Sequence, residues 1–185
     1  MNVSHIDFPH HRLMKSMIFL FAVFFPVFVA AQIKIDSSLT FPYEKQCGRA
    51  GMESNFWADV NGRVTRVKVS DRISVFFDDG KQKKVILAGI APFTDKKDEI
   101  RQMLIKSLLG QQIRIQVQPG KMDKKEFVGV IFLKDNDVSQ KLIESGKARY
   151  KNPSDNEMTS YQACTYLVVE QEAQKARRGF WTAER

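Results

Sequence analysis

The residues of this chain that could support chemistry are two cysteines, a few aspartates and two clusters of lysine. Cys47 and Cys164 are the whole cysteine content, and the histidines, His5, His10 and His11, all lie in a segment that we expect to be removed. A catalytic cysteine needs a base beside it, and two cysteines without histidine make a zinc site improbable. We therefore expect a structural disulfide between Cys47 and Cys164, formed in an oxidising compartment.

Three aspartates are candidate ligands for a hard cation such as calcium, which proteins bind through several oxygen atoms. Asp71 stands in a turn before a predicted strand, where an aspartate more often caps local backbone groups. Asp78 and Asp79 precede Gly80, and Asp-Gly supplies the positive backbone angles of a hairpin turn. Turn geometry thus accounts for all three aspartates. The alternative is that Asp71 is a metal ligand.

Six lysines flank two predicted turns: Lys81, Lys83, Lys84, Lys121, Lys124 and Lys125. The chain has 29 Lys and Arg against 21 Asp and Glu; without Arg12, Lys15 and Asp7 these become 27 and 20, a net charge of +7. A basic surface attracts polyanions such as nucleic acid, although solvated loop lysines are equally expected. Aromatic side chains that could stack on bases are Phe76, Phe77, Phe93 and Phe127, of which strand alternation assigns some to the core.

The first 31 residues are typical of a signal peptide. A basic start ends at Lys15, an apolar run covers 17–29, and Ala30-Ala31 offers small residues for cleavage before Gln32. The run is shorter than the roughly 20 residues of a membrane-spanning helix, so we expect secretion or a periplasmic location, with no stable membrane insertion after cleavage. An uncleaved membrane anchor is the alternative. Residues 32–55 are then an N-terminal extension and 56–185 one domain.

Hydrophobic periodicity predicts three strands, a helix, two strands and two helices, in the order βββ-α-ββ-α-α. The ranges are 57–69, 73–77 and 84–90 for the first strands, 96–109 for the helix, 113–117 and 127–133 for the next strands, and 138–145 and 156–178 for the last helices. Ser154 and Glu157 have capping-box spacing, and Tyr161, Cys164, Leu167 and Val168 fall on one face of the last helix. This order suits a five-stranded OB-type barrel with packed helices, an α+β fold.

Three segments resemble signatures of the staphylococcal-nuclease-like (thermonuclease) family, in the family's order. They are KVILAGIAP at 84–92, a helix entered by Asp137-Val138 and ended by ESG at 144–146, and ARRGFW at 176–181. The resemblance covers roughly 62–181. It implies an OB-type barrel, and active members of the family are calcium-dependent phosphodiesterases acting on DNA and RNA.

The same resemblance implies that the catalytic residues have mostly been replaced. The family mechanism needs acidic oxygens around calcium, a carboxylate that orients water and two arginines at the phosphate. Only Asp71 matches such a position. Elsewhere, Ile86 and Phe127 take the arginine places, Ile90-Ala91 leaves no aspartate before Pro92, and Phe93 replaces the glutamate. Arg177, Arg178 and Trp181 fall in a shared segment at a helix end, where capping and packing are the expected roles.

These observations predict an exported, catalytically inactive barrel that acts by binding single-stranded nucleic acid, another polyanion or a protein partner. No cofactor is expected. The alternative is a calcium-dependent endonuclease with a site rebuilt from Asp71, Asp78, Asp79 and neighbouring lysines. A purely structural role that relies on the 32–55 extension and the disulfide is a third possibility.

Overall fold

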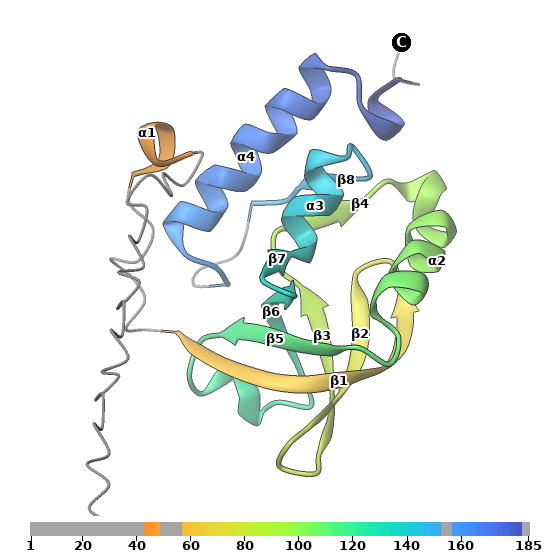
Figure 1. Cartoon of the computed structure of the whole chain (residues 1–185), viewed down its shortest axis with the longest axis vertical. Coiled ribbons are helices and arrows are strands. Elements are labelled where there is room, and N and C mark those ends of the chain that lie inside the picture. The colour runs from red at the N-terminus through yellow and green to blue at the C-terminus, as the bar shows by residue number, and fades with distance from the viewer. Residues whose placement is uncertain (1–42, 49–56, 153–156, 183–185) are drawn as a thin grey trace, which may run out of the picture. The chain divides into compact units, whose positions relative to one another are not determined.

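The computed structural model describes residues 43–48, 57–152 and 157–182 (Figure 1). The predicted signal peptide, residues 1–31, and most of the predicted extension, residues 32–55, lie outside the described residues, as does Ser154. Within the described ranges, no helix is long and apolar enough to cross a membrane. All elements below belong to the unit Ser37–Arg185.

Five strands form the predicted barrel, shown in the lower half of Figure 1. They are β1 (Ala58–Val69), β2 (Arg72–Phe77), β3 (Gln82–Leu87), β5 (Gln112–Val117) and β6 (Glu126–Leu133). Neighbours pair antiparallel in the order β3-β2-β1-β5-β6, and a parallel pairing of β3 with β6 closes the sheet. Because successive strand residues point to opposite faces, alternate side chains fill the interior. Fully buried there are Ile73, Val75, Val85, Ile115 and Ile131.

The first connections follow the expected turn and helix signals. Phe77 O accepts a hydrogen bond from the amide of Gly80 at 3.0 Å, and Asp79 accepts one from the amide of Lys81 at 3.0 Å, so Asp78-Asp79-Gly80 is the β2–β3 hairpin turn. A short 3-10 helix (Thr94–Lys96) leads into α2 (Lys97–Leu108). Its apolar face, Ile100, Leu104 and Leu108, is buried as the four-residue spacing predicts.

The predicted third strand, 84–90, is wrong in its last part. β3 ends at Leu87, and the chain turns away at Gly89 into β4 (Ile90–Pro92), which pairs with β8 (Ala148–Tyr150) in a separate two-stranded sheet. Gly89 has φ +66°, and a Cβ at this position would lie 2.3 Å from Met158 and 2.8 Å from the Tyr166 ring. The backbone approaches these side chains so closely that only glycine fits, and a continuous strand cannot pass.

The helix α3 (Val138–Glu144) begins where the Asp137-Val138 motif predicts, after the two-residue strand β7 (Asn136–Asp137). The Asp137 carboxylate accepts hydrogen bonds from the Gln140 amide at 3.0 Å and from the Tyr166 hydroxyl at 2.6 Å. Burial nevertheless raises the pKa of Asp137 from 3.8 to about 6, with these hydrogen bonds acting in the opposite direction. The cap therefore joins α3 to the last helix through a buried carboxyl group.

The last helix, α4 (Ser160–Lys175), starts later than predicted. The capping box is formed by Thr159 and Gln162, not by Ser154 and Glu157, although both pairs have the required spacing. Met158 is buried just before the cap, which fixes the later entry point. The predicted apolar face is also wrong. Leu167 is 43% exposed, and the buried residues are Thr165, Tyr166, Val169 and Ala173.

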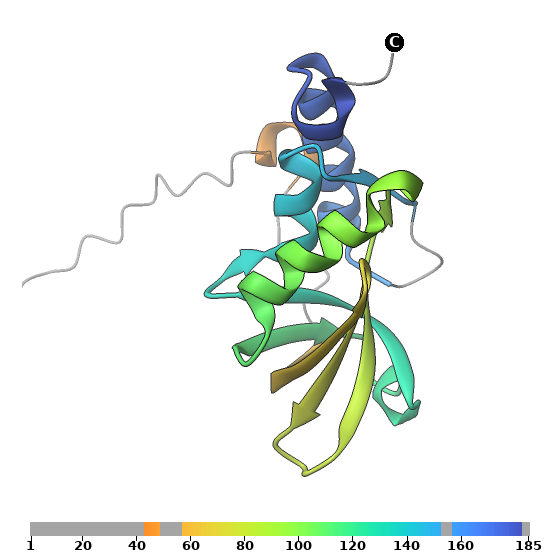
Figure 2. The same cartoon turned by 90° about the vertical axis from the view of Figure 1, so that its right-hand side faces the viewer.

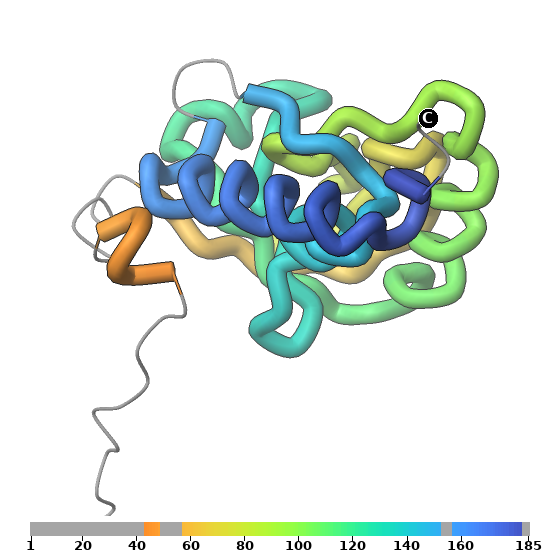
Figure 3. The backbone as a smooth tube through the Cα atoms, turned by 90° about the horizontal axis from the view of Figure 1, so that it is seen from above, coloured from red at the N-terminus to blue at the C-terminus, as the bar shows by residue number. Residues whose placement is uncertain are grey.

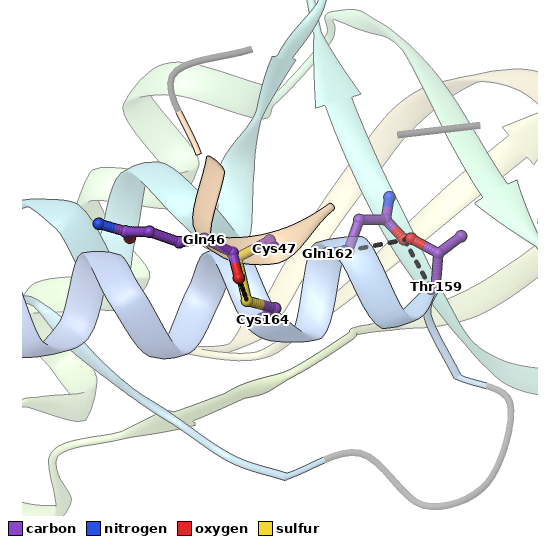
Figure 4. The surroundings of a disulfide bond; sticks show 5 residues. All are labelled: Gln46, Cys47, Thr159, Gln162 and Cys164. Atoms are coloured by element: carbon purple, nitrogen blue, oxygen red, sulfur yellow. Dashed lines mark hydrogen bonds between the residues drawn. A yellow bond between two sulfur atoms is a disulfide. The ribbon is translucent and has the colours of Figure 1, made fainter. Parts of the chain in front are cut away.

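The predicted disulfide is confirmed. Cys47 in α1 (Glu44–Cys47) is bonded to Cys164 in α4, with the two Cα atoms 5.5 Å apart. Figure 3 shows α1 beside the long α4, and Figure 4 shows the bond next to the Thr159–Gln162 cap. The disulfide thus fixes a short helix of the amino-terminal segment to the last helix of the domain.

Two of the motif segments pack directly against each other. The Phe180 amide donates a hydrogen bond to Gly146 O at 2.9 Å. A Cβ on Gly146 would lie 2.0 Å from Arg178 O, and one on Gly179 would lie 2.4 Å from Ser145 O. Arg178 also donates to Glu144 O at 3.3 Å, so it caps the end of α3 as expected of an arginine in this segment. These glycines allow the two backbones to touch.

Candidate functional site

Three of the five family positions, Asp71, Ile86 and Phe127, lie around the turn between β1 and β2 and the seam where β3 meets β6. Asp71 is in that turn, and its backbone oxygen accepts a hydrogen bond from the Leu87 amide at 2.9 Å. Its carboxylate lies 3.8 Å from Arg72, and Arg72 reaches the Glu126 carboxylate at 3.5 Å. Arg72 therefore lies between the two acidic groups of this region and compensates part of their charge.

Ile86 occupies the outer side of the seam, with Arg72 as its cross-strand neighbour on β2 and Val128 on β6. A cation is therefore present next to the position that carries arginine in the family, but it comes from the adjacent strand and is engaged by two carboxylates. A half-enclosed cavity of about 180 Å³ opens here. Its lining combines two lysines with two glutamates and apolar groups: Ile86, Lys121, Lys124, Glu126, Phe127, Val128 and Glu157.

Phe127, predicted to occupy the second arginine place, faces the barrel interior. It is 4% exposed, and its ring centroid lies 6.1 Å from that of Phe77. The residues of β6 that face outward at this level are Glu126 and Val128. Neither the predicted position nor its outward neighbours provide a guanidinium group.

Phe93, at the place of the family's glutamate, belongs to an aromatic cluster. Its ring lies 5.5 Å from Phe180 and 5.1 Å from Trp181, both edge-to-face, and the Arg149 guanidinium lies 4.6 Å above it. Phe93 is 7% exposed. This position contributes packing and no carboxylate, and Trp181 has the packing role expected of it.

The residues present do not fit a calcium site. Asp78 and Asp79 follow the end of β2, whereas Asp71 precedes its start. A six-residue strand is about 20 Å long, so the three carboxylates cannot share one cation. Among the described residues no three acidic, cysteine or histidine side chains gather in a way that could hold a metal. Asp71 alone provides too few oxygen ligands, because calcium takes about six to eight.

The two predicted lysine clusters meet in space, although about 40 residues separate them. The Lys83 ammonium group donates a hydrogen bond to Met122 O, and the Lys84 amide donates one to Lys125 O at 3.1 Å. Lys84 is opposite Glu126 in the backbone register of β3 and β6. Lys81 lies apart at the hairpin tip, 3.7 Å from Asp79. All six are at least partly exposed: Lys81, Lys83, Lys84, Lys121, Lys124 and Lys125.

The outer face of the barrel carries a group that the sequence analysis only partly identified, which we call the platform: Arg63, Arg66, Phe76 and Lys84. Phe76 is 48% exposed and has Arg63 opposite it on β1 and Gln82 on β3. Arg66 and Lys84 flank Ser74 in the next row of the same face. Within the described chain, the platform cations have no carboxylate within ion-pair distance.

The arginines of the platform were missed because of an irregularity in β1. Register shifts between Val64 and Arg66 and again between Val67 and Val69 break strict alternation. Of the four aromatic candidates, Phe76 alone is exposed, while Phe77, Phe93 and Phe127 are buried. An alternating pattern that allows one extra residue at Thr65 would have placed Arg63 and Arg66 on the same face as Phe76.

A family model described as staphylococcal nuclease homologue matches residues 80–183. The match begins at the tip of the β2–β3 hairpin and continues past α4, and it covers more than half of the chain. No curated protein matches the chain.

Proposed function

The chain belongs to the family of staphylococcal nuclease homologues, and on this basis we propose that it binds single-stranded nucleic acid on the platform and does not cleave it. The observation that carries the proposal is the exposed Phe76 ring on a strand face of an OB-type barrel, with Arg63 opposite it and Arg66 and Lys84 in the next row. This fold commonly binds oligonucleotides on the face of its second and third strands and on the neighbouring loops.

Phe76 and the surrounding charges supply the two contributions that single strands require. An exposed ring can stack on any base, which contributes about 1–3 kcal/mol per base. Arg63, Arg66 and Lys84 lie within two strand positions of the ring and can follow a phosphate backbone. The loop between β5 and β6 extends the positive charge through Lys121, Lys124 and Lys125.

The absence of cleavage follows from the residues at the family positions. One carboxylate beside an arginine cannot hold calcium, and isoleucine and two phenylalanines replace two arginines and a base. Single groups of this kind contribute roughly 100-fold or more to rate. Loss of four of the five positions therefore lowers any residual cleavage far below that of an enzyme.

Export is part of the proposal. It rests on the basic start, apolar run and small residues of 1–31, and the Cys47–Cys164 disulfide supports an oxidising compartment. A disulfide of this kind is rare in proteins that stay in a reducing cytosol.

The test measures binding and cleavage of one labelled oligothymidylate by the purified chain. Fluorescence anisotropy should show saturable binding, which Phe76→Ala weakens about 5- to 150-fold, the equivalent of about 1–3 kcal/mol. Leu167→Ala removes an equally exposed apolar side chain on α4 and should leave binding unchanged. Lys84→Gln should weaken binding and reduce its salt dependence by about 0.7 in slope.

Gel analysis of the same samples with calcium or with chelator reports cleavage. Chelator-sensitive cleavage at an enzymatic rate would refute the proposal that the chain is inactive. Equal binding by the Phe76→Ala protein would refute the platform. Absence of oligonucleotide binding by the unaltered chain would refute the proposal and leave a protein partner or another polyanion as the ligand to be tested.

A further inference from the structure

A groove separate from the platform residues is lined by α2, α3 and the β6–β7 turn. Figure 2 shows these elements from the side. Its volume is about 620 Å³, within the range of about 300–1,000 Å³ that is usual for small-molecule sites. The lining residues of α2 are Met103, Leu104, Ser107 and Leu108, and those of α3 include Val138, Lys141 and Leu142. Neither the platform nor the positions compared with the family's functional residues, Asp71, Ile86, Ile90-Ala91, Phe93 and Phe127, contribute to this lining.

The groove has an aliphatic interior. Leu104, Leu108 and Leu142 are buried at its base, and the half-buried Leu133 and Val138 form part of its walls. Its lining within the described ranges contains no aromatic side chain. An aliphatic ligand fits this surface better than a flat aromatic ring, which would have no ring to stack against.

The charges of the lining all have one sign. Lys134, Lys141 and Lys147 contribute ammonium groups, and none of the described residues that line the groove has a carboxylate. Lys141 is bonded to Glu144 at 2.8 Å. The Lys147 ammonium group lies 3.3 Å from the Met103 sulfur, the one hydrogen-bond acceptor that it contacts in the described part of the chain. A thioether is a weak acceptor, so Lys147 has capacity for an anion beside the leucines.

We propose that this groove binds a single-chain amphiphile with an anionic head, such as a fatty acid, from solution. The carboxylate binds Lys147, and the aliphatic chain lies over Leu104, Leu108 and Leu142. A protein partner is disfavoured by size, because 13 residues line the groove and a stable protein interface uses about 20–30 residues on each side.

The test uses dodecanoate below its micelle concentration as the probe, with the purified full chain and isothermal titration calorimetry. Dodecanoate should bind saturably with one molecule per chain, and dodecyltrimethylammonium, with the same alkyl chain and opposite charge, should not bind. Lys147→Gln should weaken binding about 10-fold or more, as expected for loss of a charge-assisted hydrogen bond.

Two tryptophan substitutions on α2 form a matched pair. Ser107 lines the groove and is exposed, so Ser107→Trp fills the groove and should abolish binding. Lys106 is also exposed but does not line the groove, so Lys106→Trp should bind dodecanoate normally. Circular dichroism establishes that both variants fold.

The proposal is overturned by any of four results. These are absence of saturable binding, equal binding by folded Ser107→Trp, equal binding of the cationic amphiphile, or association with anionic vesicles only. Oligonucleotide binding is measured separately and has no bearing on this outcome.

Discussion

Replacing Asp137 by asparagine should remove a pH dependence of stability that this buried carboxyl group creates. Burial raises its pKa in the folded chain from 3.8 to about 6. Between about pH 4 and pH 6 the folded chain therefore retains a proton that the unfolded chain has released. The free energy of unfolding then falls as pH rises, because the folded state binds more protons than the unfolded state.

The size of this effect follows from the shift. About two pKa units at 1.36 kcal/mol each correspond to about 3 kcal/mol. This decrease in the free energy of unfolding is absent below about pH 4, where Asp137 is protonated in both states. It is complete above about pH 7, where Asp137 is ionised in both states. Asparagine has the same shape, and its amide can still accept from the Gln140 amide and donate to the Tyr166 oxygen. It does not titrate.

Urea unfolding followed by tryptophan fluorescence at about pH 4 and about pH 8 measures the difference. The free energy of unfolding of Asp137→Asn minus that of the unaltered chain should be about 3 kcal/mol more positive at the higher pH. Asp123→Asn removes an exposed carboxylate on the β5–β6 connection and serves as the control. A difference that stays constant or declines with pH would refute the reasoning, because it would mean that Asp137 is stabilised as an anion.

Two further predictions concern the disulfide and the aromatic cluster. Cys47→Ser together with Cys164→Ser should lower the free energy of unfolding by about 4 kcal/mol, because the bond closes a loop of 117 residues in the unfolded chain; equal urea midpoints would contradict this. Phe93→Glu should destabilise the fold by about 3 kcal/mol or more through a buried charge and lost ring contacts, without creating nuclease activity. Chelator-sensitive cleavage by the folded variant would show that this position alone had blocked catalysis.

The sequence was sufficient for the barrel because each of its strands follows a local rule. Alternation of apolar and polar residues predicted the strand Gln112–Val117, and the Asp-Gly pair predicted the β2–β3 hairpin. The four-residue spacing of apolar residues predicted the buried face of α2. The Cys47–Cys164 disulfide could be predicted from the number of cysteines and from the expected oxidising compartment. The strand, the hairpin and the helix face depend on residues close together in the chain, so they can be predicted without knowledge of the packing.

The errors arise where packing decides between local alternatives. Two capping boxes of equal spacing compete at α4, and the burial of Met158 selects Thr159. Gly89 ends β3 because its backbone touches Tyr166, which is 77 residues further along the chain. The arginines of the platform were missed for a similar reason, since the irregularity of β1 depends on its partner strands. Contacts of this kind leave no periodic signal in the sequence.

The segments that carry the family resemblance are packing segments. Residues 84–92 turn a strand around Gly89, Asp137 caps α3 and binds Tyr166, and Gly146 touches Gly179. Each of these packing contacts can form without any residue that contacts a phosphate. The family match therefore accounts for the fold, while function has to be argued from the surface. There, Arg72 lies within 4 Å of the carboxylates of Asp71 and Glu126. Arg63, Arg66 and Lys84, which have no ion pair with the described residues, lie around Phe76. This arrangement is the basis of the proposal that the barrel binds nucleic acid and does not cleave it.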